Sequence, residues 1–389
     1  MTSDRLLTHR QQFPALQTKT YFNYGGQGPL STAALTAIQT AFLEGQQLGP
    51  FSLAAGQRVE QISDRLRADL ATLLQTHPEN ITLTENVSVG CNIVLWGIDW
   101  QAGDRLLITD CEHPSVVATA QAIAQRFGVE LDIWPLKSAV VAGQDLAEAF
   151  AAQLQPRTRL AAISHVLWNY GTVLPLEAIT EQAHRQDCRL LVDGAQSVGI
   201  LPLDLPASGV DFYAFTGHKW LCGPEGVGGL YSQPEARSQL LPTWLGWRGV
   251  EKNAQGWPIR SKSDGRRYEI ATSAYPLYAG LSAAIAQQAD YGNAEERYDR
   301  ARQLAQLLWR SLQTLPNVHC LATTPPQAGL VSFQVNSSQS PFKIVSQLET
   351  QGLQIRSLVG PDCLRACCHY LTLEAEVEAL VAAIAQLSC

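Results

Sequence analysis

The stretch "CRLLVDGAQSVG", residues 188–199, carries an apolar run straight into Asp193. A second run follows in "VDFYAFTGHKWLCGPEGVGGLYS", residues 210–232, and it ends at Thr216, His218 and Lys219 before a glycine-rich segment. Apolar runs of this length, rich in β-branched and aromatic residues, are typical of buried strands. Because the carboxyl ends of neighbouring parallel strands meet at one edge of a sheet, we expect Asp193 and Lys219 to lie close together there.

The same pattern repeats outward from these two runs, over residues 80–232. Short apolar runs that end in a polar residue alternate with longer segments of helical periodicity, such as residues 114–128 and 176–188. Several runs are apolar at every position, which indicates strands buried on both faces. We therefore predict an α/β fold with a mainly parallel, seven-stranded sheet flanked by helices. The expected strands are "ITLTEN", "RLLITD", "ELDIWP", "RLAAISH", "CRLLVDG", "VDFYAFTG" and "GVGGLYS".

The pattern changes near residue 290. A long helical segment over residues 294–315 leads to short strands at "GLVSFQV" and "LQIRSL", with helices at "PFKIVSQLETQ" and "EAEVEALVAAIAQL". We predict a large domain over residues 16–289 and a smaller α+β domain from residues 1–15 and 290–389. Residues 243–267 have no clear period, and we predict a long loop or lid there.

Composition limits the kinds of partner. The 389 residues are 46% hydrophobic and 16% charged, with a formal net charge of -7 and no lysine-rich or arginine-rich run, which argues against nucleic acid. The chain opens with no apolar core of signal-peptide length, and no window of about 18 residues is apolar without a charge. We expect a cytoplasmic protein that acts on a small molecule and does not span a membrane. Its nine cysteines form no C-x-x-C pair, which indicates reduced thiols.

Lys219 and Asp193 together indicate a chemistry. A lysine at the buried end of a strand loses its proton readily, because its charged form is poorly solvated, and a neutral amine can form a Schiff base with a carbonyl. An aspartate on the neighbouring strand can keep the ring nitrogen of pyridoxal phosphate protonated. Taken singly, the two are more simply a surface lysine and a helix-capping aspartate. The pair at one sheet edge favours a pyridoxal phosphate site.

A phosphate group needs its own binding site. In "LTENVSVGCNIVLWGI", residues 83–98, a strand passes into a helix whose first turn holds Ser88, and free N–H groups at a helix start bind anions. Ser88 is explained as well by a plain helix N-cap. His113, in "LLITDCEHPSVV", also follows a strand and precedes a helix. Stacking on the cofactor ring and simple helix capping both remain open for its side chain.

Five motifs carry a resemblance to a known family: "VDGAQSVG", "TGHKWLCGPEGVGGLY", "EHPSVV", "ISHVLWNYG" and "YEIATS". Together they resemble the class V aminotransferases, which are pyridoxal phosphate enzymes of fold type I. The similar branch contains cysteine desulfurases, selenocysteine lyases and cysteine/cystine C–S lyases. The resemblance runs from "YFNYGGQGPLS" to "LRACCHYLTLEAEVEAL". It implies a homodimer with pyridoxal phosphate sites at the subunit interface.

The resemblance also implies roles for individual residues. The catalytic set is Lys219, which forms the Schiff base, Asp193, which contacts the ring nitrogen, and His113, which stacks on the ring. The other implied cofactor ligands are Gln196 at the ring hydroxyl, Ser88, Thr216 and His218 at the phosphate, and Thr272 at the phosphate of the partner subunit's cofactor. The resemblance places Arg365 at the substrate α-carboxylate. Trp168 stands at the family's asparagine position and Asn169 follows it, so Asn169 is the candidate for that substrate contact. Trp247 of the predicted lid is a further candidate for binding the substrate.

The cysteines near the end of the chain separate two reactions. A cysteine desulfurase carries its nucleophilic cysteine on a loop between the strand of Arg356 and the carboxylate-binding Arg365. Here only eight residues separate the two arginines, so that loop is missing or severely shortened. Cys363 is too near Arg365 to move freely over the cofactor, and we expect Cys367 and Cys368 to face a helix interior. We predict no metal site, because adjacent cysteines cannot easily ligate one ion tetrahedrally.

We therefore expect β-elimination of cystine or cysteine to pyruvate, ammonia and a persulfide or sulfide, with sulfur supply to iron–sulfur clusters as a further hypothesis. Arg365 and Arg356 would hold the two carboxylates of cystine, and a structural salt bridge is the alternative for Arg356. Other hypotheses are a desulfurase or selenocysteine lyase that releases alanine, an epimerase-like or kynureninase-like enzyme, and a non-catalytic sulfur carrier or scaffold. The pair of Lys219 and Asp193 argues against a non-catalytic protein.

Overall fold

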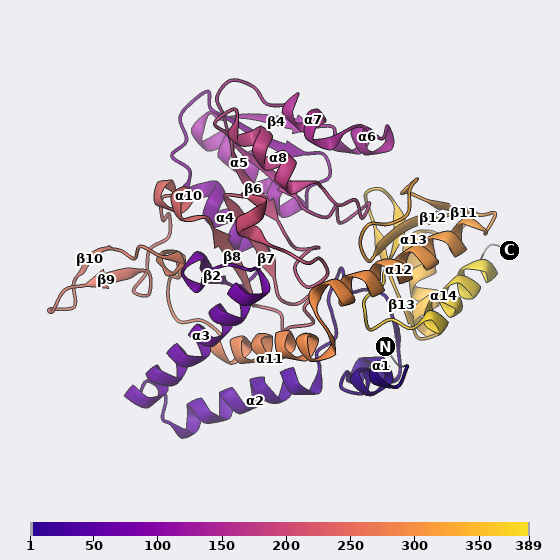
Figure 1. The fold of residues 1–389 in the computed structure, drawn as a ribbon, viewed down its shortest axis with the longest axis horizontal. Coiled ribbons are helices and arrows are strands. Elements are labelled where there is room, and N and C mark those ends of the chain that lie inside the picture. The colour runs from indigo at the N-terminus through magenta and orange to yellow at the C-terminus, as the bar shows by residue number, and fades with distance from the viewer. Residues whose placement is uncertain (1–2, 388–389) are drawn as a thin grey trace.

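The computed structural model describes residues 3–387. Residues 1–2 and 388–389, which the predicted small domain includes, lie outside the described residues. A larger part around a seven-stranded sheet and a smaller part around a four-stranded sheet lie next to each other (Figure 1). Trp220 of the larger part packs in one apolar cluster with Tyr370 and Leu371 of the smaller part, so the two parts share a core. Among the described residues, no helix is both long and apolar enough to cross a membrane.

The larger sheet confirms the predicted α/β fold. Its strands are β2 (Ile81–Thr84), β3 (Arg105–Thr109), β4 (Glu130–Trp134), β5 (Thr158–Ser164), β6 (Arg189–Asp193), β7 (Phe212–Thr216) and β8 (Gly228–Ser232), in the order β2-β8-β7-β6-β5-β3-β4. Within this sheet β8 is antiparallel to β2 and β7, and the other neighbouring pairs are parallel. The strands that follow β3 in sequence, β4 and β5, lie on opposite sides of it. The ends of β3 and β5 therefore flank a crevice of the kind in which such sheets bind ligands.

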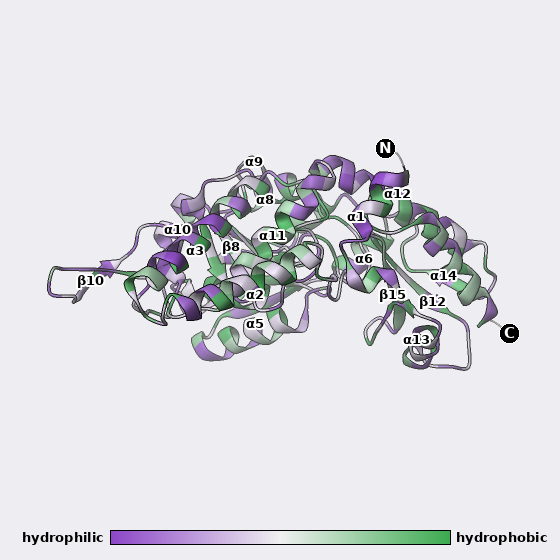
Figure 2. Ribbon diagram, turned by 90° about the horizontal axis from the view of Figure 1, so that it is seen from below, coloured by the Kyte–Doolittle hydropathy of each residue, from purple (hydrophilic) through white to green (hydrophobic). Residues whose placement is uncertain are grey.

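Both faces of this sheet are covered by helices. Alternate residues of a strand point to opposite faces. Leu106 and Ile108 pack in the cluster of α4 (Val87–Gly97) and α5 (Pro114–Phe127), whereas Leu107 packs in the cluster of α3 (Leu53–Leu73) and α8 (Leu176–His184). Burial on both sides explains why the strand runs are apolar at every position. Figure 2 shows hydrophobic stretches in the interior, around β8 and β12.

The remaining helices of the larger part surround this core. Helix α11 (Tyr275–Tyr291) packs against α2 (Thr32–Gln47) and α3 below the sheet in Figure 1. Shorter helices are α6 (Leu136–Val141), α7 (Leu146–Ala151), α9 (Leu205–Ser208) and α10 (Pro234–Gln239). Helix α1 (Ser3–Arg10) lies close to the smaller part, where Arg10 forms an ion pair with Glu376 at 2.8 Å.

The smaller part combines a sheet with helices, as the sequence predicts, and its four-stranded sheet is antiparallel. Its strands are β11 (Val318–Cys320), β12 (Leu330–Val335), β14 (Arg356–Leu358) and β15 (Cys363–Cys367), in the order β11-β12-β15-β14. Its helices are α12 (Ala294–Gln313), α13 (Pro341–Thr350) and α14 (Glu374–Gln386). The short strands β1 (Thr20–Tyr21) and β13 (Leu353–Gln354) pair in parallel, and Phe22 joins the core of this part. The domain boundaries at residues 15 and 289 stay a prediction.

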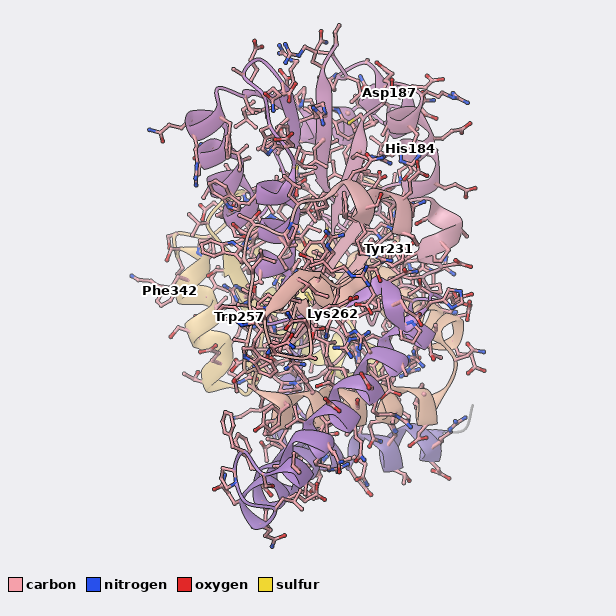
Figure 3. The ribbon with its side chains drawn as sticks, turned by 90° about the vertical axis from the view of Figure 1, so that its left-hand side faces the viewer. His184, Asp187, Tyr231, Trp257, Lys262 and Phe342 are labelled. Atoms are coloured by element: carbon pink, nitrogen blue, oxygen red, sulfur yellow. The ribbon has the colours of Figure 1, made fainter. Side chains whose placement is uncertain are left out.

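Two local predictions were wrong. Cys367 and Cys368 do not face a helix interior, because Cys367 ends strand β15, which is paired between β12 and β14. Leucine, arginine and alanine in that segment favour a helix locally, and strand pairing overrides this preference. Residues 243–267 are only partly a loop, because β9 (Val250–Lys252) and β10 (Pro258–Ser261) form a hairpin, followed by a short 3₁₀ helix at Gly265–Tyr268. Figure 3 shows Trp257 of this hairpin and Lys262 beyond it on the side from which the hairpin projects.

Candidate active site

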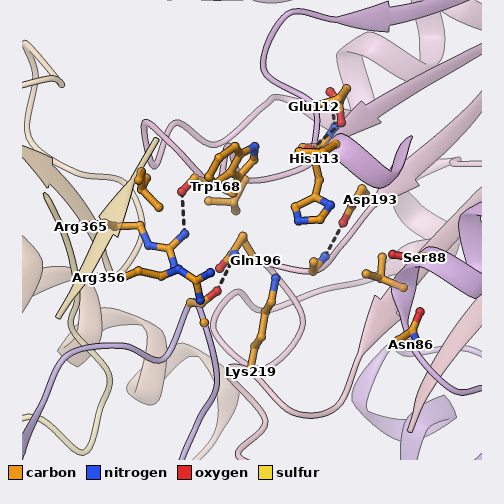
Figure 4. Close-up of a pocket in the computed structure, with 18 of the residues that line it drawn as sticks. Asn86, Ser88, Glu112, His113, Trp168, Asp193, Gln196, Lys219, Arg356 and Arg365 are labelled. Atoms are coloured by element: carbon orange, nitrogen blue, oxygen red, sulfur yellow. Dashed lines mark hydrogen bonds between the residues drawn. The ribbon is translucent and has the colours of Figure 1, made fainter. Parts of the chain in front are cut away.

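A cavity of about 900 Å³ lies at the carboxyl ends of the parallel strands, and residues of β14 and β15 form one of its walls. Eight of the predicted site residues line it together: Ser88, His113, Asp193, Gln196, His218, Lys219, Arg356 and Arg365. The first and last of these residues, Ser88 and Arg365, are 277 positions apart in the sequence. Figure 4 shows Lys219 extending its amine into this space, with His113 and Asp193 on one side and the two arginines on the other.

Lys219 and Asp193 have the electrostatic properties that the sequence indicates. Burial deprives the Lys219 amine of solvation and lowers its pKa to about 8, although the negative charge of the nearby Asp193 raises that pKa. Burial raises the pKa of Asp193, while a hydrogen bond from the backbone N–H of Ala195 (2.9 Å) and the charge of Lys219 lower it. An amine with a lowered pKa can act as a nucleophile and base near neutral pH. Asp193 keeps a buried negative charge available for a cationic group.

His113 and Gln196 stand on either side of this pair. His113 is the N-cap of helix α5, because its Nδ1 accepts from Ser115 N at 3.3 Å, and its ring also faces the cavity. Burial, and then the charge of Lys219, lower the pKa of His113, which favours a neutral ring. The Gln196 amide donates to Gly25 O (2.9 Å) and accepts from the Trp220 indole (2.8 Å). Both side chains are therefore held in defined orientations.

The far end of the cavity is suited to an anion. Asn86, Val87 and Ser88 line it at the start of α4, where backbone N–H groups lack helical partners. Asn86, and not Ser88, is the N-cap, because its side chain accepts from Val89 N at 3.1 Å. The Ser88 hydroxyl instead lies 3.1 Å from that of Ser115. His218 lines the same cavity, and Thr216 supports it through a 2.6 Å contact with His218 Nδ1 without lining the cavity itself.

Arg356 and Arg365 lie opposite each other on β14 and β15. Arg365 is buried, at 2% exposure, and donates to the Trp168 carbonyl at 2.9 Å, whereas its Nε has no hydrogen-bond partner among the described residues. Burial and the charge of Arg356 lower its pKa. No described carboxylate lies within ion-pairing distance of either arginine, so the salt bridge considered for Arg356 is absent from residues 3–387. Two facing cations without a counter-ion are suited to binding an anion.

Besides Thr216, three predicted residues lie outside this cavity. Asn169 is buried behind it, next to the Cys111 thiol, and the neighbouring Trp168 takes its place in the wall. Thr272 and Trp247 line a separate surface pocket of the same chain. Trp247 is 57% exposed there, on the surface that also carries the β9–β10 hairpin.

The chain matches the family model "Aminotransferase class-V" over residues 22–384. The chain belongs to the class V aminotransferase family. Its structure superposes with a TM-score of 0.95 on the cystine C–S lyase C-DES in complex with its product cysteine persulfide, at 50% identity, covering 97% of this chain and 100% of that one. The cysteine desulfurase CsdA from Escherichia coli gives 0.85 at 25% identity, covering 98% of each chain.

Several curated relatives of this class V aminotransferase carry desulfurase names, and two carry the name isopenicillin N epimerase. A probable cysteine desulfurase of Mycolicibacterium paratuberculosis is 33% identical over 305 residues, which are 77% of this chain and 43% of the relative. The chain thus spans less than half the length of that protein. A probable cysteine desulfurase of Xylella fastidiosa is 27% identical over 383 residues, 96% of this chain and 90% of the relative.

Pyridoxal phosphate is the cofactor of this class V aminotransferase, and a C-DES variant has glycine covalently linked to that cofactor. The residues of the cavity fit this group. Lys219 can reach an aldehyde, Asp193 is a buried carboxylate for a protonated ring nitrogen, and the start of α4 can hold the phosphate. Gly25 packs closely against the arginine side of the cavity, since a Cβ there would lie 2.9 Å from Cys367 Sγ and 3.2 Å from Arg365 Nη2.

Trp168 and Glu112 are residues of the cavity wall to which sequence reasoning gave no role. Trp168 was placed at a family position without a role, yet its ring lies 6.0 Å from that of His113, edge to face. Glu112 received no role, although it lines the cavity and is buried at 6% exposure. A glutamate directly before a helix-capping histidine reads as an ordinary residue of a helix start. Only its position next to His113 in the sequence could have singled it out.

Proposed function

We propose that this class V aminotransferase is a C–S lyase that eliminates the β-substituent of cystine, and of cysteine, to give pyruvate, ammonia and a persulfide or sulfide. The observation that carries the proposal is the facing pair of Arg356 and Arg365, next to a β14–β15 turn too short to hold a mobile cysteine. The similarity to the cystine C–S lyase C-DES supports it.

The two arginines suit a substrate with two carboxylates. Like charges directly opposite each other on neighbouring strands destabilise a sheet unless an anion lies between or beside them. Arg365 is buried at the inner side of the cavity, close to Gly25 and Gln196, and is suited to the carboxylate next to the reacting carbon. Arg356 is exposed toward the opening and is suited to the distant carboxylate of cystine. Cysteine, with one carboxylate, leaves Arg356 without a partner.

The turn between β14 and β15 excludes a desulfurase-type cysteine. It consists of residues 359–362, Val-Gly-Pro-Asp, and is closed by a hydrogen bond from Asp362 N to Val359 O at 3.1 Å. Cys363, the next residue, is fully buried, does not line the cavity of Lys219, and has a pKa raised by burial to about 11. A buried thiol with a raised pKa is a poor nucleophile. The sulfur must therefore leave with the product.

Lys219 and Asp193 each have a task in this reaction. Bound pyridoxal phosphate supplies an aldehyde for the substrate amine and a ring that takes up electrons from the α-carbon. Lys219, with its lowered pKa, removes the α-proton, and Asp193 keeps a negative charge beside the ring nitrogen. The C–S bond then breaks with its electron pair on sulfur. A persulfide anion is a weaker base than a thiolate, so the persulfide of cystine leaves more readily than the thiol of cysteine.

The proposal extends to a homodimer. Exposed apolar side chains gather around the end of α2, the start of α3 and residues 241–247, with Phe51 98% exposed and Trp244 62% exposed. Thr272 and Trp247 line a pocket on this surface, where a partner subunit's cavity would receive them. Such a surface is typical of a subunit interface. A cytoplasmic location and delivery of the released sulfur to iron–sulfur clusters belong to the same proposal.

Product analysis tests the activity. Purified enzyme loaded with pyridoxal phosphate is incubated with cystine, and pyruvate, alanine and sulfide are quantified. We expect pyruvate in proportion to cystine consumed. Alanine as the main product would instead establish a desulfurase. Size-exclusion chromatography with light scattering tests the dimer, and a monomer with full activity would refute an interfacial role for Thr272.

A further inference from the structure

Glu112 is a buried carboxylate in the wall of the active-site cavity, at the crevice between β3 and β5. Its Oε1 accepts from the Thr109 hydroxyl (2.7 Å) and from Ser164 N (3.0 Å), and its Oε2 accepts from the Ser164 hydroxyl (2.7 Å). All these donors are neutral, and among residues 3–387 no cation lies within ion-pairing distance of it. A buried carboxylate without a cation is costly, so a purely structural role would be served as well by glutamine.

The position of Glu112 links it to the residues on either side of the cofactor ring. Ser164 of β5 pairs in register with Asp193 of β6 and also donates to Glu112. Ser164 therefore lies between Glu112 and Asp193. His113 is the next residue in the chain, and the hydrogen bonds of Glu112 fix the backbone from which its ring projects. Figure 4 shows Glu112 beside His113 at the edge of the cavity, on the same side as Asp193.

The titratable groups near Glu112 leave Asp193 as its main charged neighbour. Cys91 from α4 and the adjacent Cys111 both have pKa values raised by burial, so they are neutral at physiological pH. His113 has a lowered pKa and is mainly neutral as well. Burial, together with the charge of Asp193, raises the pKa of Glu112 to about 7. Glu112 is therefore mostly protonated below that pH and ionised above it.

We propose that Glu112 is a positioning residue that acts through Asp193 and His113, by adding a second negative charge next to Asp193 when the cofactor ring binds with its nitrogen protonated. The inference rests on the proposed function, which places the ring between these two residues. A positive ring nitrogen relieves the repulsion between the carboxylates and favours ionised Glu112. By reciprocity, ionised Glu112 strengthens binding of the protonated ring. The charge is present above about pH 7 and absent below it.

Glu112→Gln isolates the charge. The amide oxygen can accept from Thr109 and Ser164 N, and the amide nitrogen can donate to the Ser164 hydroxyl, so the hydrogen bonds persist without the charge. Apoenzymes of wild type and E112Q are titrated with pyridoxal phosphate at about pH 6 and about pH 8, and the dissociation constants are measured. We expect equal affinity at the lower pH and binding on the order of tenfold weaker for E112Q at the higher pH.

Ser164→Ala provides a second measurement that does not depend on the folding of E112Q. Loss of the Ser164 hydroxyl removes a hydrogen bond that favours the ionised carboxylate, so the pKa of Glu112 rises further. The pH at which cofactor affinity increases then shifts upward, whereas the affinity at high pH is retained. A ratio of affinities between variant and wild type that is the same at both pH values would show that Glu112 is only structural. An unchanged midpoint in S164A would also overturn the proposal.

Lys219→Ala separates this inference from the proposed function. If wild type binds pyridoxal phosphate with a visible absorbance band that K219A lacks, the cofactor binds at Lys219 as proposed. The measurements on E112Q and S164A then test the role of Glu112 alone. If wild type shows no such band, both the proposed function and the role of Glu112 are overturned.

Discussion

Replacing Arg356 by glutamine should impair the use of cystine much more than the use of cysteine. Arg356 has no ion-pair partner among the described residues and faces Arg365 across β14 and β15, so its removal deprives no carboxylate of its counter-ion. A hydrogen bond between ionised groups contributes about 1.5 to 3 kcal/mol. Arg356 is exposed, and solvent reduces the contribution to about 1 kcal/mol. Because about 1.4 kcal/mol is a factor of ten, kcat/KM for cystine should fall roughly 5-fold.

The assay follows pyruvate by coupled reduction with lactate dehydrogenase, with cystine in the absence of reductant and with cysteine in its presence. The distant carboxylate does not take part in the chemical step, so the loss should appear mainly in KM. Arg310→Gln, on an exposed face of α12 far from the cavity, is the matched control. It should leave kcat/KM unchanged for both cystine and cysteine. Equal losses for cystine and cysteine, or no loss for cystine, would refute the two-carboxylate site.

Three further predictions follow from the same cavity. Arg365→Gln should lower kcat/KM for both substrates by about 100-fold or more, because this buried cation has no substitute at the reacting end; retention of activity with either substrate would contradict its role. Cys363→Ala should keep most activity with cystine and cost about 1 kcal/mol of unfolding free energy in a denaturant titration, since a small buried side chain is removed; loss of turnover at unchanged stability would restore a nucleophilic role. The rate at which apoenzyme develops visible absorbance with pyridoxal phosphate should rise with pH and level off above about pH 8, because the pKa of Lys219 is lowered to about 8 and the neutral amine reacts; a rise that continues toward pH 10 would show an ordinary lysine.

The sheet and the reacting pair could be predicted because both depend on local sequence. A run that is apolar at every position identifies a strand buried on two faces, and the polar residue that closes it lies at the ligand-binding edge, as at Asp193 and Lys219. The four-residue turn before Cys363 could also be anticipated from the spacing of Arg356 and Arg365. In each case the decisive contact is between neighbouring strands.

Contacts between distant segments could not be predicted in the same way. Glu112 gains its environment from Ser164, which is 52 residues away in the chain. Trp168, at the family's asparagine position, lies in the cavity wall, whereas the loop after β5 buries Asn169 outside the cavity. Cys367 lies in a strand because β12 and β14 pair on either side of β15, which local helix preference does not reveal.

The ratio of pyruvate to alanine formed from cystine tests the central claim most directly. Wild-type enzyme loaded with pyridoxal phosphate is incubated with cystine under anaerobic conditions, and both three-carbon products are quantified by nuclear magnetic resonance together with the sulfur products. Elimination at the Lys219 site predicts one pyruvate and one persulfide for each cystine consumed, with alanine at background. Alanine as the main three-carbon product would contradict the account.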